Sequence, residues 1–589
     1  MERRIWMIKT LAGSLRENKK GSVTTVLLSI LEAAFEILIP LCMAKVIDDG
    51  IEPENMNAVW RYGLILLVLA AFQLLTGVLC AHTAARAAVG FSANLRQDMY
   101  DNVQTFAFSN IDKFSTASIV TRLTTDVTNI QNAYQMLIRM AVRGPVMLVF
   151  SMIVSFRING TIAWIFLGVI PVMTVLLLLI IRKVNPIFNR VFHTYDELNN
   201  VVQENVRGIR VVKSFNREDY EISKFKRISK RIYEDFAKGE RFIAFNAPIM
   251  QFFMYSCMIL ISWIGAKAIV EGGNNPDLGM TTGDLTALFS YAMQILVSLM
   301  MLSMVFVMIT ISIASARRIA EILEEKTDIE NPENPKTEVK DGSICFENVD
   351  FVYASKADKK VLSNVNLSID SGQTVGIIGG TGSSKSSLVQ LIPRLYDVTG
   401  GRITLGGVDV REYDLNVLRD SVAMVLQKNE LFSGTIKDNL RWGNENADDE
   451  EIEHACRLAC ADEFIQTLPD KYDTYIEQGG TNVSGGQKQR LCIARALLKK
   501  PKVLILDDST SAVDTKTDAL IQKSFSEYIP QTTKIIIAQR ISSIQHADQI
   551  IVLDDGKITD VGNHDQLMKH SAIYREVYES QQKGGREDE

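Results

Sequence analysis

A glycine-rich stretch in the C-terminal half carries the residue types that bind phosphate groups. Residues 379–386 read Gly-Gly-Thr-Gly-Ser-Ser-Lys-Ser and follow the apolar run 374–378. Where such a turn opens a helix, backbone N–H groups cradle phosphate, a lysine neutralises it, and a hydroxyl can coordinate Mg²⁺. We assign phosphate binding to one continuous run of residues: Gly379, Gly380, Thr381, Gly382, Ser383, Ser384, Lys385, Ser386 and Ser387.

This loop departs from the strict phosphate-loop pattern at one position. The pattern G-x-x-x-x-G-K-[ST] requires Gly directly before Lys, but Ser384 precedes Lys385. We expect a Cβ at this position to alter the close approach of the backbone to phosphate. The chemistry does not depend on the pattern alone, because Lys385 and the Ser386 hydroxyl keep their places.

A second apolar run ends in two carboxylates. Residues 504–506 are Leu-Ile-Leu and lead directly into Asp507 and Asp508. A buried strand of this kind delivers carboxylates to Mg²⁺ and water. We therefore expect Asp507 to bind Mg²⁺ together with Ser386, and Asp508 to lie near the attacking water.

These motifs, in this order and with a second glycine-rich turn at Ser484, Gly485, Gly486 and Gln487, resemble the ATPase domain of an ABC transporter. The resemblance implies ATP and Mg²⁺ as cofactors, with Tyr353 stacking on adenine and Gln427 contacting Mg²⁺ and water. It implies that residues 484–487 close over nucleotide held by a facing ATPase domain, and that residues 511–514 (Ser-Ala-Val-Asp) form a loop at the dimer face. Otherwise, Tyr353 is an ordinary strand aromatic and Gln427 an ordinary residue after a strand.

Three residues depart from the pattern of this family. Asp508 stands where the family usually places Glu, Gln539 where it places His, and Gln478 where exporters often have Glu. Asp is one methylene shorter than Glu, and Gln cannot carry a positive charge towards the γ-phosphate. With the 484–487 motif intact, the chain resembles the degenerate-site subunit of a heterodimeric bacterial exporter. The alternative is a homodimer that tolerates Asp and Gln.

The N-terminal half reads as a membrane bundle. A span needs about 20 apolar residues, and six stretches qualify: 22–46, 59–82, 134–157, 160–183, 243–270 and 285–312. Lysine and arginine at the N-terminus and near 182–190 place both termini in the cytoplasm. The long polar insertions 83–133 and 184–242 predict helical stalks that turn near 108–120 and 207–218. The resemblance implies that these turns are coupling helices; plain amphipathic stalks are the alternative.

Two acidic residues lie within the first span. Glu32 and Glu36 are four residues apart and therefore share one helix face. Ionisable groups at that depth are costly and usually face a cavity or a partner. They form either a site for cationic or amphipathic substrates or a structural pair satisfied by Arg139 or Arg143.

Composition and length fit this organisation. The net charge of −6 over 589 residues argues against a general nucleic-acid binder, and the seven cysteines contain no CxxC pair. The predicted fold is an all-α six-helix transmembrane domain with long cytoplasmic helical extensions, followed by an α/β P-loop ATPase domain of the ABC type. The expected boundaries are a transmembrane domain over 1–325, a linker over 326–341, a nucleotide-binding domain over 342–580 and a polar tail over 581–589.

The resemblance implies ATP-driven export of amphipathic small molecules across the plasma membrane. The chain would be one multi-pass half of a dimer in the lipid bilayer, paired with a second ABC half-transporter that carries the consensus Glu and His. A lipid flippase or peptide exporter of the same architecture is an alternative. Another is a membrane-anchored nucleotide-sensing regulatory subunit. Fusion of the ATPase after six spans argues against an importer.

Overall fold

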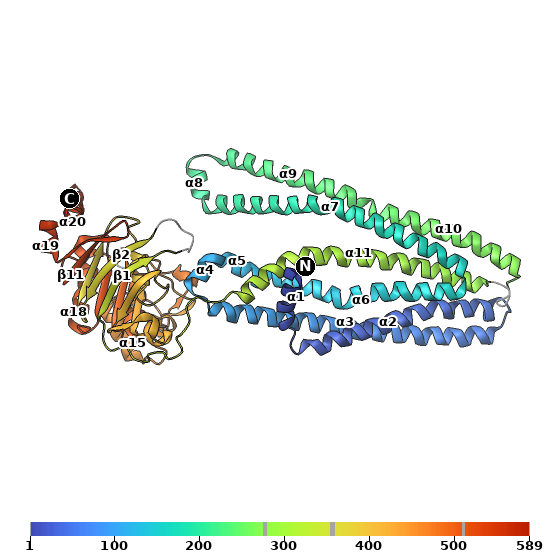
Figure 1. Ribbon diagram of the computed structural model, residues 1–589, viewed down its shortest axis with the longest axis horizontal. Coiled ribbons are helices and arrows are strands. Elements are labelled where there is room, and N and C mark those ends of the chain that lie inside the picture. Colours follow the sequence, from blue (N-terminus) through green and yellow to red (C-terminus); the bar gives the residue numbers. More distant parts are fainter. Residues whose placement is uncertain (1, 275–279, 354–359, 509–512, 588–589) are drawn as a thin grey trace. The chain divides into compact units, whose positions relative to one another are not determined.

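The computed structural model describes residues 2–274, 280–353, 360–508 and 513–587 (Figure 1). The chain divides into two compact units. The first comprises Met1–Gln104 and Ser115–Glu325, and the second comprises Thr105–Phe114 and Lys326–Glu589. The short segment 105–114 therefore belongs with the C-terminal unit, although in the sequence it separates two helices of the N-terminal unit.

The first unit is helical over nearly all of its described residues. Six of its helical segments are long and apolar enough to cross a membrane, which confirms the six predicted spans: Asn18–Ile51, Met56–Gln104, Thr116–Ile158, Gly160–Arg207, Glu218–Gly272 and Thr282–Glu324. The helices are α1 (Glu2–Gly13), α2 (Asn18–Val46), η1 (Ile47–Ile51), α3 (Met56–Gln104), α5 (Thr116–Thr121), η2 (Arg122–Asp126), α6 (Val127–Ile158), α7 (Gly160–Arg207), α8 (Ile209–Ser214), α9 (Glu218–Ala244), α10 (Asn246–Gly272) and α11 (Thr282–Glu324).

Both predicted turns of the stalks contain short helices. In the second stalk, α8 connects α7 to α9, which pack against each other along their length (Figure 1). In the first stalk, α4 (Phe108–Phe114) follows α3. The predicted helical stalks, which turn near 108–120 and 207–218, are thus confirmed.

The two intramembrane glutamates are held by one arginine. Arg143 of α6 donates from Nη1 to Glu32 Oε1 (2.8 Å) and from Nη2 to Glu36 Oε2 (2.5 Å), both on α2. Glu32 is only 6% exposed, and a Cβ on Gly77 of α3 would lie 3.3 Å from its Oε1. Of the two interpretations of the glutamates, this geometry favours the structural one, a cross-link between α2 and α6 formed by Arg143 rather than Arg139.

We expect Arg143→Met to destabilise the membrane unit by about 3 kcal/mol, because it leaves the buried carboxylate of Glu32 and the half-buried carboxylate of Glu36 without a counter-charge. Replacing all three charges (E32Q, E36Q and R143M together) should recover most of that loss. Arg139→Met is the matched control, since Arg139 lies one turn earlier on α6 and makes no ion pair among the described residues. Thermal unfolding of the full chain in nanodiscs measures the difference; a wild-type midpoint for R143M would contradict the cross-link.

The second unit is built on three sheets. A six-stranded sheet has the order β12-β11-β3-β10-β9-β6, a four-stranded sheet has the order β2-β1-β4-β5, and β7 pairs with β8. The strands are β1 (Ile344–Phe351), β2 (Leu362–Ile369), β3 (Thr374–Ile378), β4 (Gly400–Leu405), β5 (Val408–Asp409), β6 (Val422–Val425), β7 (Gly434–Thr435), β8 (Tyr475–Ile476), β9 (Val503–Asp507), β10 (Thr533–Ile537), β11 (Gln549–Asp554) and β12 (Lys557–Gly562).

Helices flank these strands in the second unit. They are α12 (Lys385–Gln390), α13 (Leu415–Ser421), α14 (Ile436–Arg441), α15 (Asp449–Leu458), α16 (Asp462–Gln466), α17 (Gly485–Leu498), α18 (Thr515–Tyr528), α19 (His564–His570) and α20 (Ala572–Glu587), with 3₁₀ turns η3 (Val410–Glu412), η4 (Lys471–Asp473), η5 (Gln478–Gly480) and η6 (Ile541–Ser543). The stretch from 581 onward, expected as a polar tail, is helical as far as Glu587. The six helices and the sheet-containing unit together confirm the predicted fold class.

One strand prediction needs correction. The sequence indicates separate strands at 344–346 and 349–353, but the structure has a single strand, β1, that ends at Phe351. Its pairing with β2 shifts register between Phe346 and Val349, where Asn348 has a positive φ of 48°. A β-bulge thus carries the strand through the polar residues that suggested a break, and Tyr353 lies beyond the strand's end.

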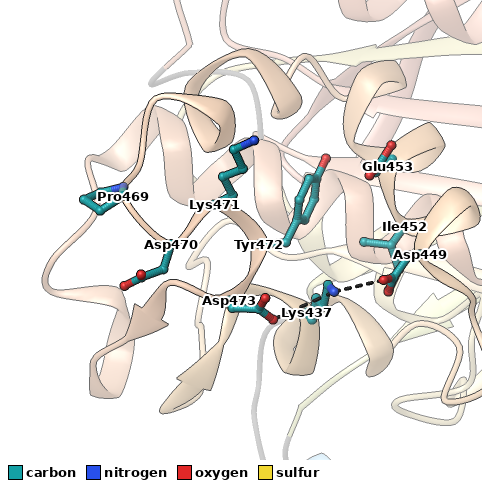
Figure 2. A pocket seen from close by; sticks show the side chains of 9 residues that line it. All are labelled: Lys437, Asp449, Ile452, Glu453, Pro469, Asp470, Lys471, Tyr472 and Asp473. Atoms are coloured by element: carbon teal, nitrogen blue, oxygen red, sulfur yellow. Dashed lines mark hydrogen bonds and ion pairs between the residues drawn. The ribbon is translucent and has the colours of Figure 1, made fainter.

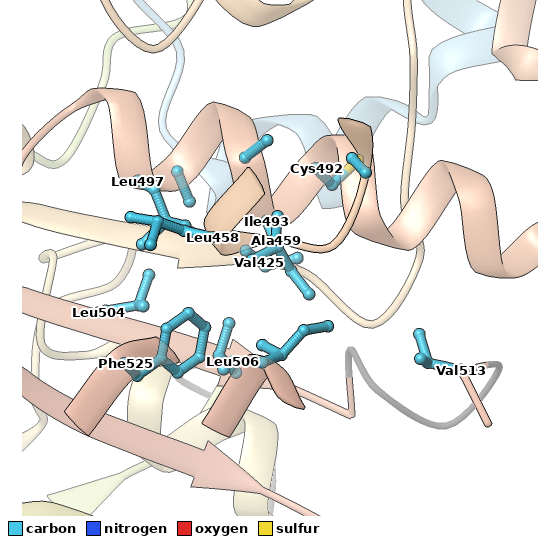
Figure 3. Close-up of a cluster of buried hydrophobic side chains, with 14 of the residues drawn as sticks. Val425, Leu458, Ala459, Cys492, Ile493, Leu497, Leu504, Leu506, Val513 and Phe525 are labelled. Atoms are coloured by element: carbon cyan, nitrogen blue, oxygen red, sulfur yellow. The ribbon is translucent and has the colours of Figure 1, made fainter. Parts of the chain in front are cut away.

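The buried core holds the strands of the six-stranded sheet and their helices together. Leu504 and Leu506 of β9 pack in one apolar cluster with Ile493 and Leu497 of α17 and Phe525 of α18 (Figure 3). All five residues of β9 are buried. A parallel strand covered on both faces is mostly apolar, and the first acid, Asp507, is the last residue of β9.

Candidate functional site

Four neighbouring parallel strands bring the predicted site residues to one edge. In register, Ile537 of β10 pairs with Asp507 of β9 on one side and Ile377 of β3 on the other, while Val425 of β6 pairs with Leu506. Carboxyl ends of parallel strands open towards the same edge of a sheet, where ligands of α/β proteins bind. Gln427, Asp508, Gln539 and the glycine-rich loop therefore all follow strands that end at this edge.

The glycine-rich loop joins β3 to α12 and is closed by its own lysine. Lys385 Nζ donates to the carbonyl oxygens of Gly379 (2.9 Å) and Gly380 (2.8 Å) and to Ser383 Oγ (3.2 Å). Burial lowers the pKa of Lys385. At Gly379, any Cβ would lie 2.0 Å from the Leu553 carbonyl oxygen, so only glycine fits. The Lys385 ammonium group thus lies inside the loop. It would have to leave these oxygens to contact a phosphate.

Ser384 shows what its departure from the pattern means physically. It caps α12 with φ of 74° and ψ of 25°, the left-handed region. That region costs a residue with a Cβ about 1–2 kcal/mol. The Cβ of Ser384 therefore strains the backbone of the loop itself.

Two oxygen ligands lie side by side at the end of β9. Ser386 Oγ donates to Asp507 Oδ1 over 3.0 Å, and Asp507 is 3% exposed. Burial raises the pKa of Asp507. A hydroxyl beside a carboxylate is the oxygen donor set that suits Mg²⁺, so these residues fit the ion that the sequence predicts for them.

Asp508 is bound by the two glutamines expected beside it. Its Oδ2 accepts hydrogen bonds from Gln539 Nε2 (2.7 Å) and Gln427 Nε2 (3.4 Å). Asp508 has a positive φ of 49°, and burial raises the pKa of its carboxyl group. The structure therefore brings the three predicted catalytic residues together around one carboxylate oxygen.

Tyr353 lies beside the loop. Its hydroxyl group hydrogen-bonds with Ser387 Oγ (2.8 Å), and its ring is 44% exposed. An exposed ring next to the loop that begins α12 can receive a base. It also meets the Tyr396 ring edge to face, with centroids 5.1 Å apart.

Sequence reasoning missed the contacts behind Tyr353. Tyr396 Oη donates to Asp112 Oδ2 (2.8 Å) of α4, and its ring lies 6.0 Å from Phe108 of the same helix. Burial and Asp112 raise the pKa of Tyr396. These residues are nearly 300 positions apart and match no motif, so only the fold reveals the contact.

The second glycine-rich turn begins a helix that presents its N-terminus to solvent. Ser484 and Gln487 form a reciprocal capping box: Ser484 Oγ accepts from Gln487 N (3.3 Å), and Gln487 Oε1 accepts from Ser484 N (2.9 Å). The first N–H groups of a helix have no partner within it and favour anions. The exposed start of α17 therefore has N–H groups that can receive an anion such as the phosphate predicted for this motif.

The remaining predicted positions lie elsewhere in the ATPase unit or outside the described residues. Gln478 begins η5, six residues before Ser484. In the 511–514 loop, Ser511 and Ala512 lie outside the described residues, while Val513 is buried and Asp514 caps α18 by accepting from Thr517 N.

A separate hollow lies among α14, α15 and η4. It has a volume of about 400 Å³ and is lined by Lys437, Asp449, Ile452, Glu453, Pro469, Asp470, Lys471, Tyr472 and Asp473 (Figure 2). Lys437 Nζ is paired with Asp449 (3.0 Å) and Asp473 (3.8 Å). None of its lining residues belongs to the phosphate, Mg²⁺ or capping motifs described above.

Comparison with known proteins decides the family. Residues 23–300 match the model of the ABC transporter transmembrane region and residues 362–511 that of the ABC transporter. The uncharacterised ABC transporter ATP-binding protein YfiB of Bacillus subtilis is 37% identical, covering 94% of this chain and 95% of YfiB. This chain belongs to the ABC transporter family.

Two further similarities are informative. The ATP-dependent lipid A-core flippase of Desulfotalea psychrophila is 32% identical over 83% of this chain and 82% of its own. The structure of a bacterial Atm1-family ABC exporter with ATP bound superposes with a TM-score of 0.78 at 23% identity, covering 96% of this chain and 99% of that one. This ABC transporter chain is therefore a multi-pass membrane protein with the fold of an exporter half, and an ATP-binding ABC-type ATPase.

The strained loop position gives a direct test. Ser384→Gly should stabilise the ATPase unit by about 0.5–1 kcal/mol, because relief of the left-handed strain exceeds the added freedom of glycine in the unfolded chain. Ser384→Ala keeps the Cβ and should leave stability unchanged. Pulse proteolysis of the full chain across a urea series measures both variants. Equal stability of the two would show that φ at 384 carries no strain.

Proposed function

We propose that this chain is the degenerate-site subunit of a heterodimeric exporter that moves amphipathic small molecules out across the plasma membrane. Both termini are cytoplasmic in this proposal. The partner is a different ABC half-transporter that supplies the consensus Glu and His. The observation that carries the proposal is the contact between Gln539 and Asp508.

That contact weakens hydrolysis at the chain's own site in two ways. A water molecule activated by Asp508 has to compete with amide N–H groups for the oxygen that already accepts from Gln539 and Gln427. Gln539 also remains neutral when it turns towards a phosphate, so it stabilises developing negative charge less than His⁺. ATP binding is unaffected by either change, because the loop, Lys385 and Ser386 are present.

The intact capping box supports a productive role of this chain at its partner's nucleotide. The exposed start of α17 offers Ser484 and its backbone N–H groups to phosphates held across the dimer. When bound, Mg²⁺ neutralises phosphate charge beside Ser386 and Asp507. ATP bound between the two ATPase domains favours their closed state, and this differential affinity shifts the membrane halves.

Two other functions fit parts of this picture. Lipid flipping is supported by the similarity to the Desulfotalea psychrophila flippase, and peptide export shares the same architecture. A membrane-anchored nucleotide sensor would use the weakened site without moving cargo. Transport of defined lipids, peptides and drugs in proteoliposomes separates these functions.

Purified alone in lipid, the chain should bind Mg-ATP and turn it over negligibly. The double substitution Asp508→Glu with Gln539→His should raise turnover at least tenfold, because it restores a longer base and a cationic side chain beside intact binding residues. Turnover, nucleotide binding and oligomeric state are measured on the same samples. Sustained turnover by the wild-type homodimer would overturn the degenerate-site proposal.

In the complex with its partner, substitutions in the two glycine-rich motifs of this chain should affect ATP turnover to different extents. Ser484→Ala should lower turnover at least tenfold, because it acts on the partner's productive site. Lys385→Ala should leave more than half of the turnover, because it acts on the slow site. The opposite ranking of the two variants would place the productive site in this chain.

A further inference from the structure

The C-terminal helix α20 is anchored so that one face meets the residues after β10. Tyr574, near its start, is fully buried in the core of the ATPase unit, and Val577 and Tyr578 pack against the same core. Gln581 follows Tyr574 by seven residues, about two helical turns, and therefore shares this face.

The side-chain amide of Gln581 hydrogen-bonds to the backbone on both sides of Arg540. Its Nε2 donates to the Gln539 carbonyl oxygen (2.7 Å), and its Oε1 accepts from Ile541 N (2.9 Å). Gln539, whose carbonyl oxygen accepts from Gln581, in turn donates from Nε2 to Asp508 Oδ2 (2.7 Å). One side-chain amide thus fixes the backbone from which Gln539 reaches the end of β9.

Besides Gln581, the segment 539–541 is held by the Arg540 carbonyl oxygen, which accepts from Ser543 N (3.3 Å), and by the burial of Ile541. Gln539 and Arg540 are both exposed and follow the end of β10 at Ile537, whereas Ile541 is 1% exposed. A backbone with exposed side chains samples several conformations unless hydrogen bonds select one. The Gln581 amide supplies that selection from a helix 40 residues further along the chain.

We propose that Gln581 is a positioning residue for nucleotide recognition: it holds the segment 539–541 so that Gln539 faces the γ-phosphate position beside Asp508. This inference rests on the proposed nucleotide contact of Gln539. Gln581 then acts on the third phosphate and on nothing that ADP presents. A purely structural role of Gln581, fastening α20 to the sheet, would affect both nucleotides equally.

The test compares two adjacent glutamines on one helix. Gln581→Met keeps the length of the side chain and removes both hydrogen bonds. Gln582→Met is the matched control, because the Gln582 amide donates to Tyr578 Oη (2.8 Å) on its own helix. The full chain in nanodiscs is titrated with AMP-PNP and with ADP, each in competition with a fluorescent nucleotide.

We expect Gln581→Met to weaken AMP-PNP binding about three- to tenfold, as the loss of one or two net hydrogen bonds predicts, and to change ADP binding less than twofold. Gln582→Met should leave both affinities within about twofold of the wild type. In a Gln539→Ala background, Gln581→Met should add no further loss for AMP-PNP, because coupled residues are not additive. Equal losses for both nucleotides, no loss at all, or full additivity would each overturn the positioning role.

The readout is independent of hydrolysis. If the wild-type chain turned ATP over rapidly, the degenerate-site proposal would fail, but the contrast between AMP-PNP and ADP would still decide the role of Gln581. Gln581→Glu serves as a second variant: it keeps the acceptor for Ile541 N and loses the donor to Gln539. Its carboxylate oxygen faces the Gln539 carbonyl oxygen, and repulsion between these two acceptors should weaken AMP-PNP binding at least as much as Gln581→Met; an affinity equal to that of the wild type would overturn the positioning role.

Discussion

The site depends on the parallel pairing of β6, β9, β10 and β3. Most residues of these strands are apolar because the sheet is covered on both faces, and the candidate site residues lie at or just after the strand ends. Parallel pairing places all four ends at one edge, and the main chain continues the alignment past the strands: Asp508 N donates to the Ile537 carbonyl oxygen (3.0 Å). A single antiparallel exchange among these strands would send Gln427, Asp508 or Gln539 to the opposite edge.

The chain accepts backbone strain at two points of that edge. Ser384 and Asp508 both have positive φ, at the positions where the loop becomes α12 and where β9 leaves the sheet. Strained residues persist only where surrounding structure fixes them. Here the buried strand β9 and the anchored helix α12 do so, and the result is that Lys385, Ser386 and Asp507 converge. Only Ser384 breaks the rule that glycine fills such a position in the loop.

The membrane half is governed by a different constraint, the absence of water. Glu32 and Glu36 lie within the helices of this half, and Arg143 pairs with both carboxylates. By contrast, α4 comes from the membrane half of the sequence but groups with the ATPase unit, where Asp112 and Phe108 meet Tyr396. This contact links a stalk segment to the aromatic group that includes Tyr353, so Tyr353, the candidate adenine-stacking residue, and α4 share one cluster of rings.

The sequence by itself determined the membrane spans, the glycine-rich loop, the candidate residues for Mg²⁺ and the family resemblance. These features depend on local order: apolar length, glycine before a helix, and acids after a buried strand. Even the departures from the phosphate-loop and family patterns at Ser384, Asp508 and Gln539 are visible in the sequence. The sequence does not show the structural consequence of each departure. The φ angle at Ser384 and the hydrogen bond from Gln539 to Asp508 arise only when separate segments are packed together.

Tertiary structure alone decided the β1 bulge, the choice of Arg143 over Arg139, the contact of Tyr396 with Asp112, and the grip of Gln581 on residues 539–541. The bulge depends on how β1 pairs with β2, and the other three join residues separated by about 40 to nearly 300 positions. Local propensity carries no information about such pairs. They are set by strand order, helix rotation and burial, which minimise unpaired polar groups over the whole chain.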